Sequence, residues 1–135
     1  MMAQIHVACD GDWGEPEVQT SGSAKALADF GVFLNSVAEH TNFEVPALES
    51  EFYPVSVKTI IIEPVQSGGD RLTVTVDEHN FNLTGTKVAL NKLGDSLINF
   101  FDDDSGIGEH FQLDYYEGNE VLNETNCHLI FICDR

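Results

Sequence analysis

The sequence predicts an α+β fold made of a tandem pseudo-repeat of two β-β-α-β-β units, with an antiparallel sheet and two helices packed on one face. The first observation is an internal similarity, in which residues 21–38 align without a gap with residues 84–101. Both segments carry apolar residues at spacings of three and four, which is typical of an amphipathic helix lying on a sheet. Alternating apolar residues, typical of half-buried strands, lie on both sides of each segment.

The length of 135 residues predicts a single domain, because two independent cores need a longer chain. We expect two pseudo-repeats that share one core, at about 4–65 and 71–134, joined by a Gly-rich turn at 66–70. The predicted strands lie at residues 5–9, 17–21, 43–45 and 60–62, and then at 71–77, 81–83, 110–116 and 127–133. The three isoleucines at 60–62 predict a central, buried strand.

Each predicted helix has a hydroxyl residue before it and a glycine inside its apolar stripe. Ser23 and Thr86 are expected to be N-caps, because their hydroxyls can accept a hydrogen bond from a first-turn N–H. Gly31 and Gly94 occupy equivalent helical positions, where glycine costs about 1 kcal/mol relative to alanine. We expect a close approach of the helix to the sheet, or to the other helix, to offset that cost.

The composition is strongly acidic, with a net charge of −17 and only six Lys and Arg residues against 23 Asp and Glu. Binding to nucleic acid or to an anionic membrane is disfavoured, because both depend on basic side chains. A basic protein surface is the favoured partner, since complementary potentials steer association. The alternative is that the acidity only keeps the protein soluble.

Localisation and cofactors are inferred from what the sequence lacks. The N-terminal residues show no signal-peptide pattern and no run of 18 apolar residues occurs, so we expect a cytoplasmic protein. Cys9, Cys127 and Cys133 lie in apolar runs without CxxC spacing and are expected to be reduced, buried thiols. The five histidines have no zinc-binding spacing, and Asp10 and Asp12 have no calcium-loop pattern. No cofactor, metal or catalytic activity is therefore expected.

Positions that differ between the two copies are the candidates for function. Val32 and Phe33 align with Asp95 and Ser96, and they are expected either to form an exposed apolar pair or to be covered by residues 46–54. An exposed pair would favour contact with a partner, including a homodimer. Acidic residues follow both helices. Three consecutive aspartates at 102–104 are unfavourable beside the negative end of a helix dipole, so stability does not explain them.

The second half of the chain resembles a known family. A TGT turn at 84–86 precedes a leucine-containing helix, which is followed by H-F-Q-L-D-Y-Y-E-G-N at 110–119 and by L-I-F-I at 129–132. This order resembles the small predicted immunity proteins of bacterial polymorphic toxin systems, in particular the family numbered thirty-two, mainly over residues 71–133. Those proteins show H-x-H-L after the helix, whereas Gln112 stands at the second His position here, so no role is transferred to that motif. The resemblance implies a cytoplasmic protein that neutralises a cognate toxin without catalysis or a cofactor.

These observations together predict an immunity-type binding protein that neutralises a basic bacterial toxin domain through an acidic surface. The residues expected to contact the toxin are acidic or aromatic: Asp102, Asp103, Asp104, Glu109, Tyr115, Tyr116, Trp13 and Phe33. Two alternatives remain, namely a homo-oligomeric structural domain that pairs through Val32 and Phe33, and a small-molecule enzyme with a site assembled in space.

Overall fold

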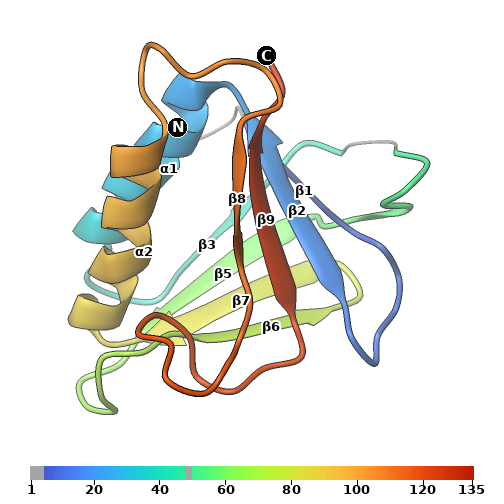
Figure 1. The fold of residues 1–135 in the computed structure, drawn as a ribbon. Coiled ribbons are helices and arrows are strands. Elements are labelled where there is room, and N and C mark those ends of the chain that lie inside the picture. Colours follow the sequence, from blue (N-terminus) through green and yellow to red (C-terminus); the bar gives the residue numbers. More distant parts are fainter. Residues whose placement is uncertain (1–4, 48–49) are drawn as a thin grey trace.

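Helices and strands alternate in the order that the sequence predicts, and the α+β class is confirmed. The computed structural model describes residues 5–47 and 50–135, and within them it has two helices and nine strands (Figure 1). The elements are β1 (His6–Cys9), β2 (Glu17–Gly22), α1 (Ala24–Ser36), β3 (Thr41–Glu44), β4 (Val55–Ser56), β5 (Thr59–Pro64), β6 (Thr73–Asp77), β7 (Asn80–Gly85), α2 (Lys87–Phe100), β8 (His110–Leu113) and β9 (His128–Cys133).

The strands form two mixed sheets, so the expectation of one antiparallel sheet is wrong. Sheet A has the order β4-β1-β2-β9-β8, and sheet B has the order β3-β5-β7-β6. The hairpins β1–β2, β3–β5, β6–β7 and β8–β9 are antiparallel, as local connections favour. Parallel pairs, β2 with β9 and β5 with β7, then join a hairpin from the first half of the chain to one from the second half. The short strand β4 lies at the edge beside β1 and was not predicted.

Both helices begin at the predicted caps. The Ser23 hydroxyl accepts the Ala26 N–H at 3.0 Å, and the Thr86 hydroxyl accepts the Ala89 N–H at 3.2 Å. Each bond satisfies one of the backbone donors that a first helical turn leaves unpaired.

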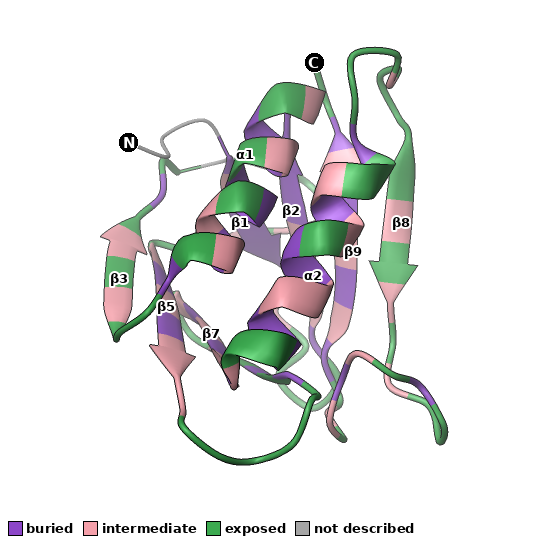
Figure 2. Ribbon diagram, turned by 90° about the vertical axis from the view of Figure 1, so that its left-hand side faces the viewer, coloured by how far each residue is buried: buried purple, intermediate pink, exposed green. Residues whose placement is uncertain are grey.

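Gly31 and Gly94, which occupy equivalent positions in the two helices, face each other where α1 crosses α2. A Cβ on Gly31 would lie 2.5 Å from the carbonyl oxygen of Gly94, and a Cβ on Gly94 would lie 2.7 Å from that of Gly31. The predicted close approach is therefore between the helices. Figure 2 shows the two helices side by side in front of the sheets, with buried residues on the sides that face them.

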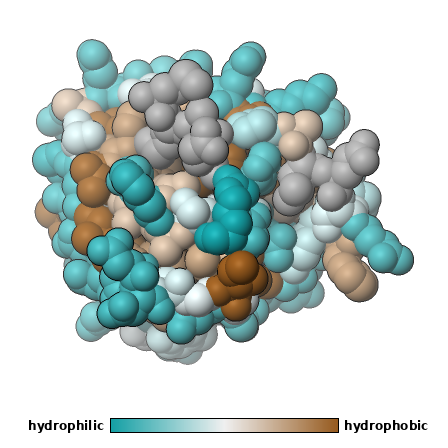
Figure 3. Space-filling view, turned by 90° about the horizontal axis from the view of Figure 1, so that it is seen from above, coloured by the Kyte–Doolittle hydropathy of each residue, from teal (hydrophilic) through white to brown (hydrophobic). Residues whose placement is uncertain are grey.

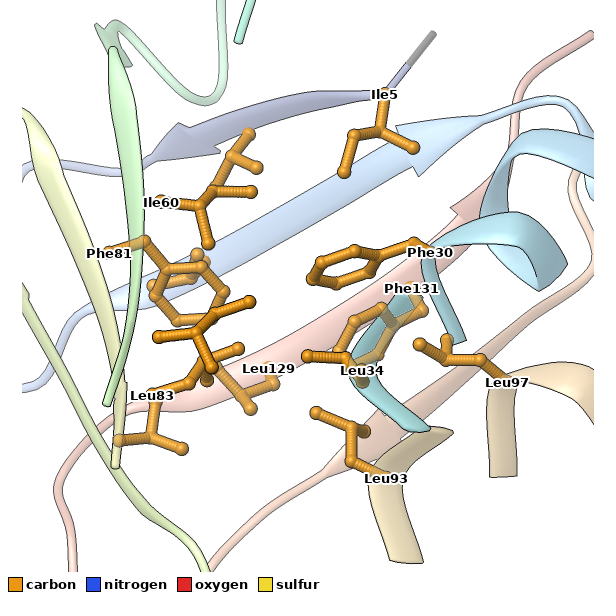
Figure 4. Close-up of a cluster of buried hydrophobic side chains, with 14 of the residues drawn as sticks. Ile5, Phe30, Leu34, Ile60, Phe81, Leu83, Leu93, Leu97, Leu129 and Phe131 are labelled. Carbon is orange, nitrogen blue, oxygen red and sulfur yellow. The ribbon is translucent and has the colours of Figure 1, made fainter. Parts of the chain in front are cut away.

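The core lies between the helix pair and the inner faces of both sheets. Figure 4 shows side chains from the two helices, from sheet B and from sheet A pointing toward one another: Phe30, Leu34, Leu93, Leu97, Ile60, Phe81, Leu83, Leu129 and Phe131. Strand β5 lies between β3 and β7, so the predicted central position of the isoleucine run is confirmed. Ile60 and Ile62 are fully buried and Ile61 is half-buried on the outer face.

Three further predictions concern cysteines, strand ends and membrane spans. All three cysteines are buried and unbonded, and burial raises the pKa of the Cys9 thiol. Strand β8 ends at Leu113 rather than at residue 116, because a loop built around Asn119 begins there. In the part of the chain that the structure describes, no helix is long and apolar enough to cross a membrane.

Candidate partner-binding surface

All the predicted contact residues except Phe33 fall at the two ends of β8 and not in one cluster. Residues 102–109, called here the acidic loop, run directly into the start of β8, and residues 114–116 follow its end. Four residues of strand span about 13 Å. The acidic and the aromatic candidates are therefore separated by the length of this strand, which lies at the edge of sheet A (Figure 1).

The acidic loop holds Asp102, Asp103, Asp104 and Glu109, and all four are exposed. The Asp102 carboxylate accepts the Asp104 N–H at 2.8 Å, which shapes the turn after α2. Among the described residues, no salt bridge involves any of the four carboxylates. Negative charge is thus concentrated without compensation beside the C-terminus of a helix, where it is unfavourable for stability.

Apolar side chains lie among these carboxylates. Ile107 is 78% exposed at the tip of the acidic loop, and Phe100 is 39% exposed at the end of α2. Phe100 packs edge-on against Phe101 and Phe111, at centroid distances of 4.8 and 5.0 Å, which holds it in place. Figure 3 views this end of the molecule and shows mostly hydrophilic side chains with separate hydrophobic patches between them.

The aromatic candidates Trp13, Tyr115 and Tyr116 lie at the opposite end of β8. Trp13 belongs to the turn before β2, and β2 starts beside the start of β9, so this turn is at the same end of sheet A as the residues after β8. Trp13 is 47% exposed, Tyr116 is 64% exposed and Tyr115 is half-buried. This end therefore presents aromatic surface next to polar groups.

Side-chain hydrogen bonds to the backbone fix the loops that carry these aromatic residues. The Asp10 carboxylate accepts the N–H groups of Asp12 and Glu17, at 3.0 and 3.2 Å, and so holds the turn around Trp13. Asn119 is 5% exposed, and its side-chain amide donates to the carbonyl oxygens of Tyr116 and Leu122 at 2.9 and 3.1 Å. Asp10 therefore has a structural role, and it is not a candidate for partner contact.

A histidine between two carboxylates lies at the same end, and sequence reasoning missed it. His128 Nδ1 is 2.7 Å from Asp114 Oδ1, and its Nε2 is 2.7 Å from Glu15 Oε1. Because a carboxylate only accepts hydrogen bonds, both ring nitrogens must donate, which requires the imidazolium form. The hydrogen bond that His128 donates to Asp114, and then the one that it donates to Glu15, raise the pKa of His128.

The two hydrogen bonds of His128 connect the turn around Trp13 to β9 and to the end of β8. Asp114 lies opposite His128 if the β8–β9 register is continued by one residue, so this contact follows from the hairpin. Glu15 is more than 100 positions from His128 and could not be paired with it from the sequence alone. The two ring nitrogens point away from each other, and no group of three or more His, Cys, Asp or Glu among residues 5–47 and 50–135 is placed to hold a metal ion.

Phe33 lies apart from the other candidates. Its ring packs edge-on against Phe43 of β3 at 5.3 Å, so it is half-buried against that strand. The alternative cover, residues 46–54, includes positions 48 and 49, which lie outside the described residues. Its neighbour Val32 is 56% exposed. The two residues therefore do not form the exposed apolar pair that the sequence suggested.

A shallow depression of about 370 Å³ lies near the N-terminus of α2. Its lining includes Val37, Pro64, Val65 and Val88, and contains no His, Cys, Asp or Glu. The ammonium group of Lys87, which also lines it, donates to the Asn35 carbonyl at 2.8 Å.

A comparison with protein families identifies the C-terminal part of the chain. Residues 81–134 match the family model Immunity protein 32. The resemblance seen in the sequence is thereby confirmed. The Immunity protein 32 match covers less than half of the 135 residues and runs from β7 through α2, the acidic loop and β8 to the end of β9. The chain matches no curated protein and no solved structure.

Proposed function

We propose that this protein is an immunity-type binding protein that neutralises a cognate bacterial toxin in the cytoplasm, without a cofactor and without catalysis. The observation that carries the proposal is the Immunity protein 32 match over residues 81–134. The matched segment contains the acidic loop and Tyr115 and Tyr116, which were singled out from the sequence for their chemistry.

The partner surface is proposed to be basic. The chain carries a net charge of −17, and its acidic loop has four exposed carboxylates without a salt bridge among the described residues. Such a surface raises the association rate with a positively charged protein and repels acidic ones. A toxin domain that itself binds phosphates or nucleic acid would present a surface of this kind.

The proposed contact surface follows β8 from one end to the other. Asp103, Asp104 and Glu109 supply charge at the first end, and Trp13 and Tyr116 supply exposed aromatic area at the second. Binding energy concentrates on aromatic and apolar anchors that a polar rim surrounds. Asp102 lies at the first end, where its carboxylate already accepts the Asp104 N–H. Tyr115 lies at the second end and is half-buried, so less of its surface is available for contact. Phe33 is not part of this surface, because it packs on β3.

Capture of the partner tests the proposal directly. The tagged protein is used as bait in a lysate of its native host, and the retained proteins are identified by mass spectrometry. The proposal expects a basic domain that is toxic when produced alone. It is contradicted if no such domain is retained, or if the retained proteins are not toxic when produced alone.

A matched charge reversal separates the acidic loop from acidity in general. Asp103→Lys with Asp104→Lys is expected to weaken toxin binding, mainly through a slower association rate. Glu39→Lys with Glu44→Lys is the control, because it changes the net charge by the same amount at two exposed carboxylates that follow α1, as the acidic loop follows α2. Equal loss in both variants would contradict a specific role for the acidic loop.

We also propose that the chain arose by duplication of a β-β-α-β-β unit, with units at about 4–65 and 71–134 forming a single domain. The two parallel pairings support this idea, because Glu17 pairs with His128 at the start of one and Asn80 pairs with Thr59 at the start of the other. Gly31 and Gly94 meet at equivalent helical positions. In this arrangement β3 and β8 are equivalent edge strands, which allows one to serve as the control for the other.

A further inference from the structure

Strand β8 has an open edge. The Cys133 N–H donates to the Glu109 carbonyl at 2.9 Å, which places residues 109 and 133 in a hydrogen-bonded pair. Such pairs alternate along an antiparallel ladder, so Phe111 and Leu113 also bond to β9. The backbone N–H and C=O groups of His110 and Gln112 therefore point away from β9. Within residues 5–47 and 50–135, no backbone group bonds to them.

The surrounding structure leaves this edge uncovered. In Figure 2, β8 is the outermost element on its side of the molecule. Strand β6, one of the two edge strands of sheet B, is instead covered by another segment of the chain. The Leu72 N–H just before it donates to Val121 at 2.8 Å, and the Thr125 hydroxyl donates to the Val74 carbonyl at 3.0 Å. The segment around residues 121–125 thus occupies the edge of β6, whereas no segment of the described chain forms such bonds to the outer edge of β8.

The second open edge, β3, differs from β8 in charge. The Val45 N–H donates to Lys58 at 2.9 Å, and by the same alternation Asn42 and Glu44 point their backbone groups outward. Near β3 the exposed cation Lys58 offsets part of the charge of the exposed carboxylates of Glu39 and Glu44. The end of β8 beside the acidic loop has several exposed carboxylates without a salt bridge among the described residues. An added strand that carries positive charge is therefore favoured at β8.

We propose that an extended, lysine- or arginine-bearing segment of the partner protein adds to sheet A as a strand beside β8. Its backbone pairs with the outward groups of His110 and Gln112, and its basic side chains reach the carboxylates of the acidic loop. Open strand edges are templates for such addition, in which backbone bonds supply affinity and side chains supply specificity. A second copy of this chain is a poorer occupant than a basic segment, because two copies that each carry a net charge of −17 repel each other.

The inference rests on the proposed function for the identity of the partner, but its test does not need the toxin. The probe is a capped, fluorescent peptide of alternating lysine and valine, about eight residues long, added to the full-length protein and followed by fluorescence anisotropy. The control peptide has the same sequence and charge, with N-methyl groups on two adjacent central residues that block both of its edges. We expect the control to bind about tenfold more weakly, because the backbone bonds are lost. Equal binding of the two peptides overturns the proposal.

A pair of protein variants locates the site. Gln112→Pro removes an N–H that points outward and leaves the bonds to β9 in place, as proline at an edge strand allows. Asn42→Pro makes the equivalent change on β3. Peptide affinity is expected to fall about tenfold in Gln112→Pro and to stay within about twofold of wild type in Asn42→Pro. The reverse pattern, or the same loss in both, overturns the assignment to β8.

Two further measurements keep the outcomes separate. Thermal unfolding of each variant shows whether the variant is folded. If Gln112→Pro does not fold, the comparison of the two peptides on the wild-type protein decides whether a strand is added. In hydrogen exchange, the His110 and Gln112 amides are expected to gain protection when the peptide binds. If the native toxin binds Gln112→Pro as tightly as wild type, strand addition is wrong and the proposed function stands. If no toxin is found while the peptide still adds to β8, the proposed function fails and strand addition stands.

Discussion

Replacement of Gly31 by alanine tests whether the helices meet as closely as the structure shows. At an exposed helical site, alanine is more stable than glycine by about 1 kcal/mol. At Gly31 the new Cβ would lie 2.5 Å from the Gly94 carbonyl oxygen and 3.0 Å from side-chain atoms of Leu97 and Ile98. Because the nearest atom belongs to the backbone, the helices must move apart, and overpacking of this kind costs about 1–3 kcal/mol.

We expect Gly31→Ala to lower the free energy of unfolding by up to about 2 kcal/mol after the gain in helix propensity is subtracted. The assay is urea unfolding followed by circular dichroism, with a thermal melt in which Tm falls by about 3–5 °C for each kcal/mol. Gly106→Ala is the control, because no atom lies within 4 Å of its added Cβ and its φ is not positive. The close approach is refuted if Gly31→Ala is more stable than wild type by about 1 kcal/mol, which is what alanine gains at an unobstructed helical site.

The other predictions concern the caps, His128 and Val32. Ser23→Ala and Thr86→Ala are each expected to cost about 1 kcal/mol in urea unfolding, because each removes the bond to a first-turn N–H, and no change in either would contradict the cap assignment. The pKa of His128 is raised, so its bonds stabilise the fold fully below its ordinary pKa of about 6.5 and lose this contribution as pH rises through the raised value. His128→Gln should therefore reduce stability at pH 6 by about 1 kcal/mol or less and flatten the pH dependence above it, and an unchanged pH profile would argue against the imidazolium. The homodimer alternative is tested by light scattering on wild type and on Val32→Asp, where Val32 is exposed, and both are expected to have the monomer mass. A wild-type dimer that becomes a monomer in Val32→Asp would support the homodimer instead.

Local features of the fold could be predicted because they depend on neighbouring residues. The caps at Ser23 and Thr86, the two amphipathic helices and the hairpins each follow from short patterns of spacing and turn residues. Even the close approach at Gly31 followed from the cost of a glycine within a helix. The family resemblance, carried by residues 110–119 and 129–132, was recognisable for the same reason, since it lies in consecutive motifs.

Long-range pairing could not be predicted. The parallel contact of Glu17 with His128 joins residues more than 100 positions apart, and alternation along a strand indicates which face is buried but not which strand lies beside it. One antiparallel sheet was therefore expected where two mixed sheets occur. The Glu15 contact of His128 was missed for the same reason.

The arrangement of the candidate site was only partly visible in the sequence. The unfavourable charge at residues 102–104 indicated a function, and the family match includes this segment. The sequence could not show that Phe33 packs on Phe43, because that contact depends on β3 returning beside α1. It also could not show that β8 is an edge strand, since this follows from the order of sheet A.

Protection of living cells tests the central claim most directly. A basic domain that the protein retains from its native host is produced in a susceptible bacterial host, with wild-type protein or with the Asp103→Lys, Asp104→Lys variant, and growth is measured. The account predicts that the wild-type protein restores growth and that the variant, at equal abundance, restores it poorly. Growth arrest that is the same with the wild-type protein as without it would contradict the account.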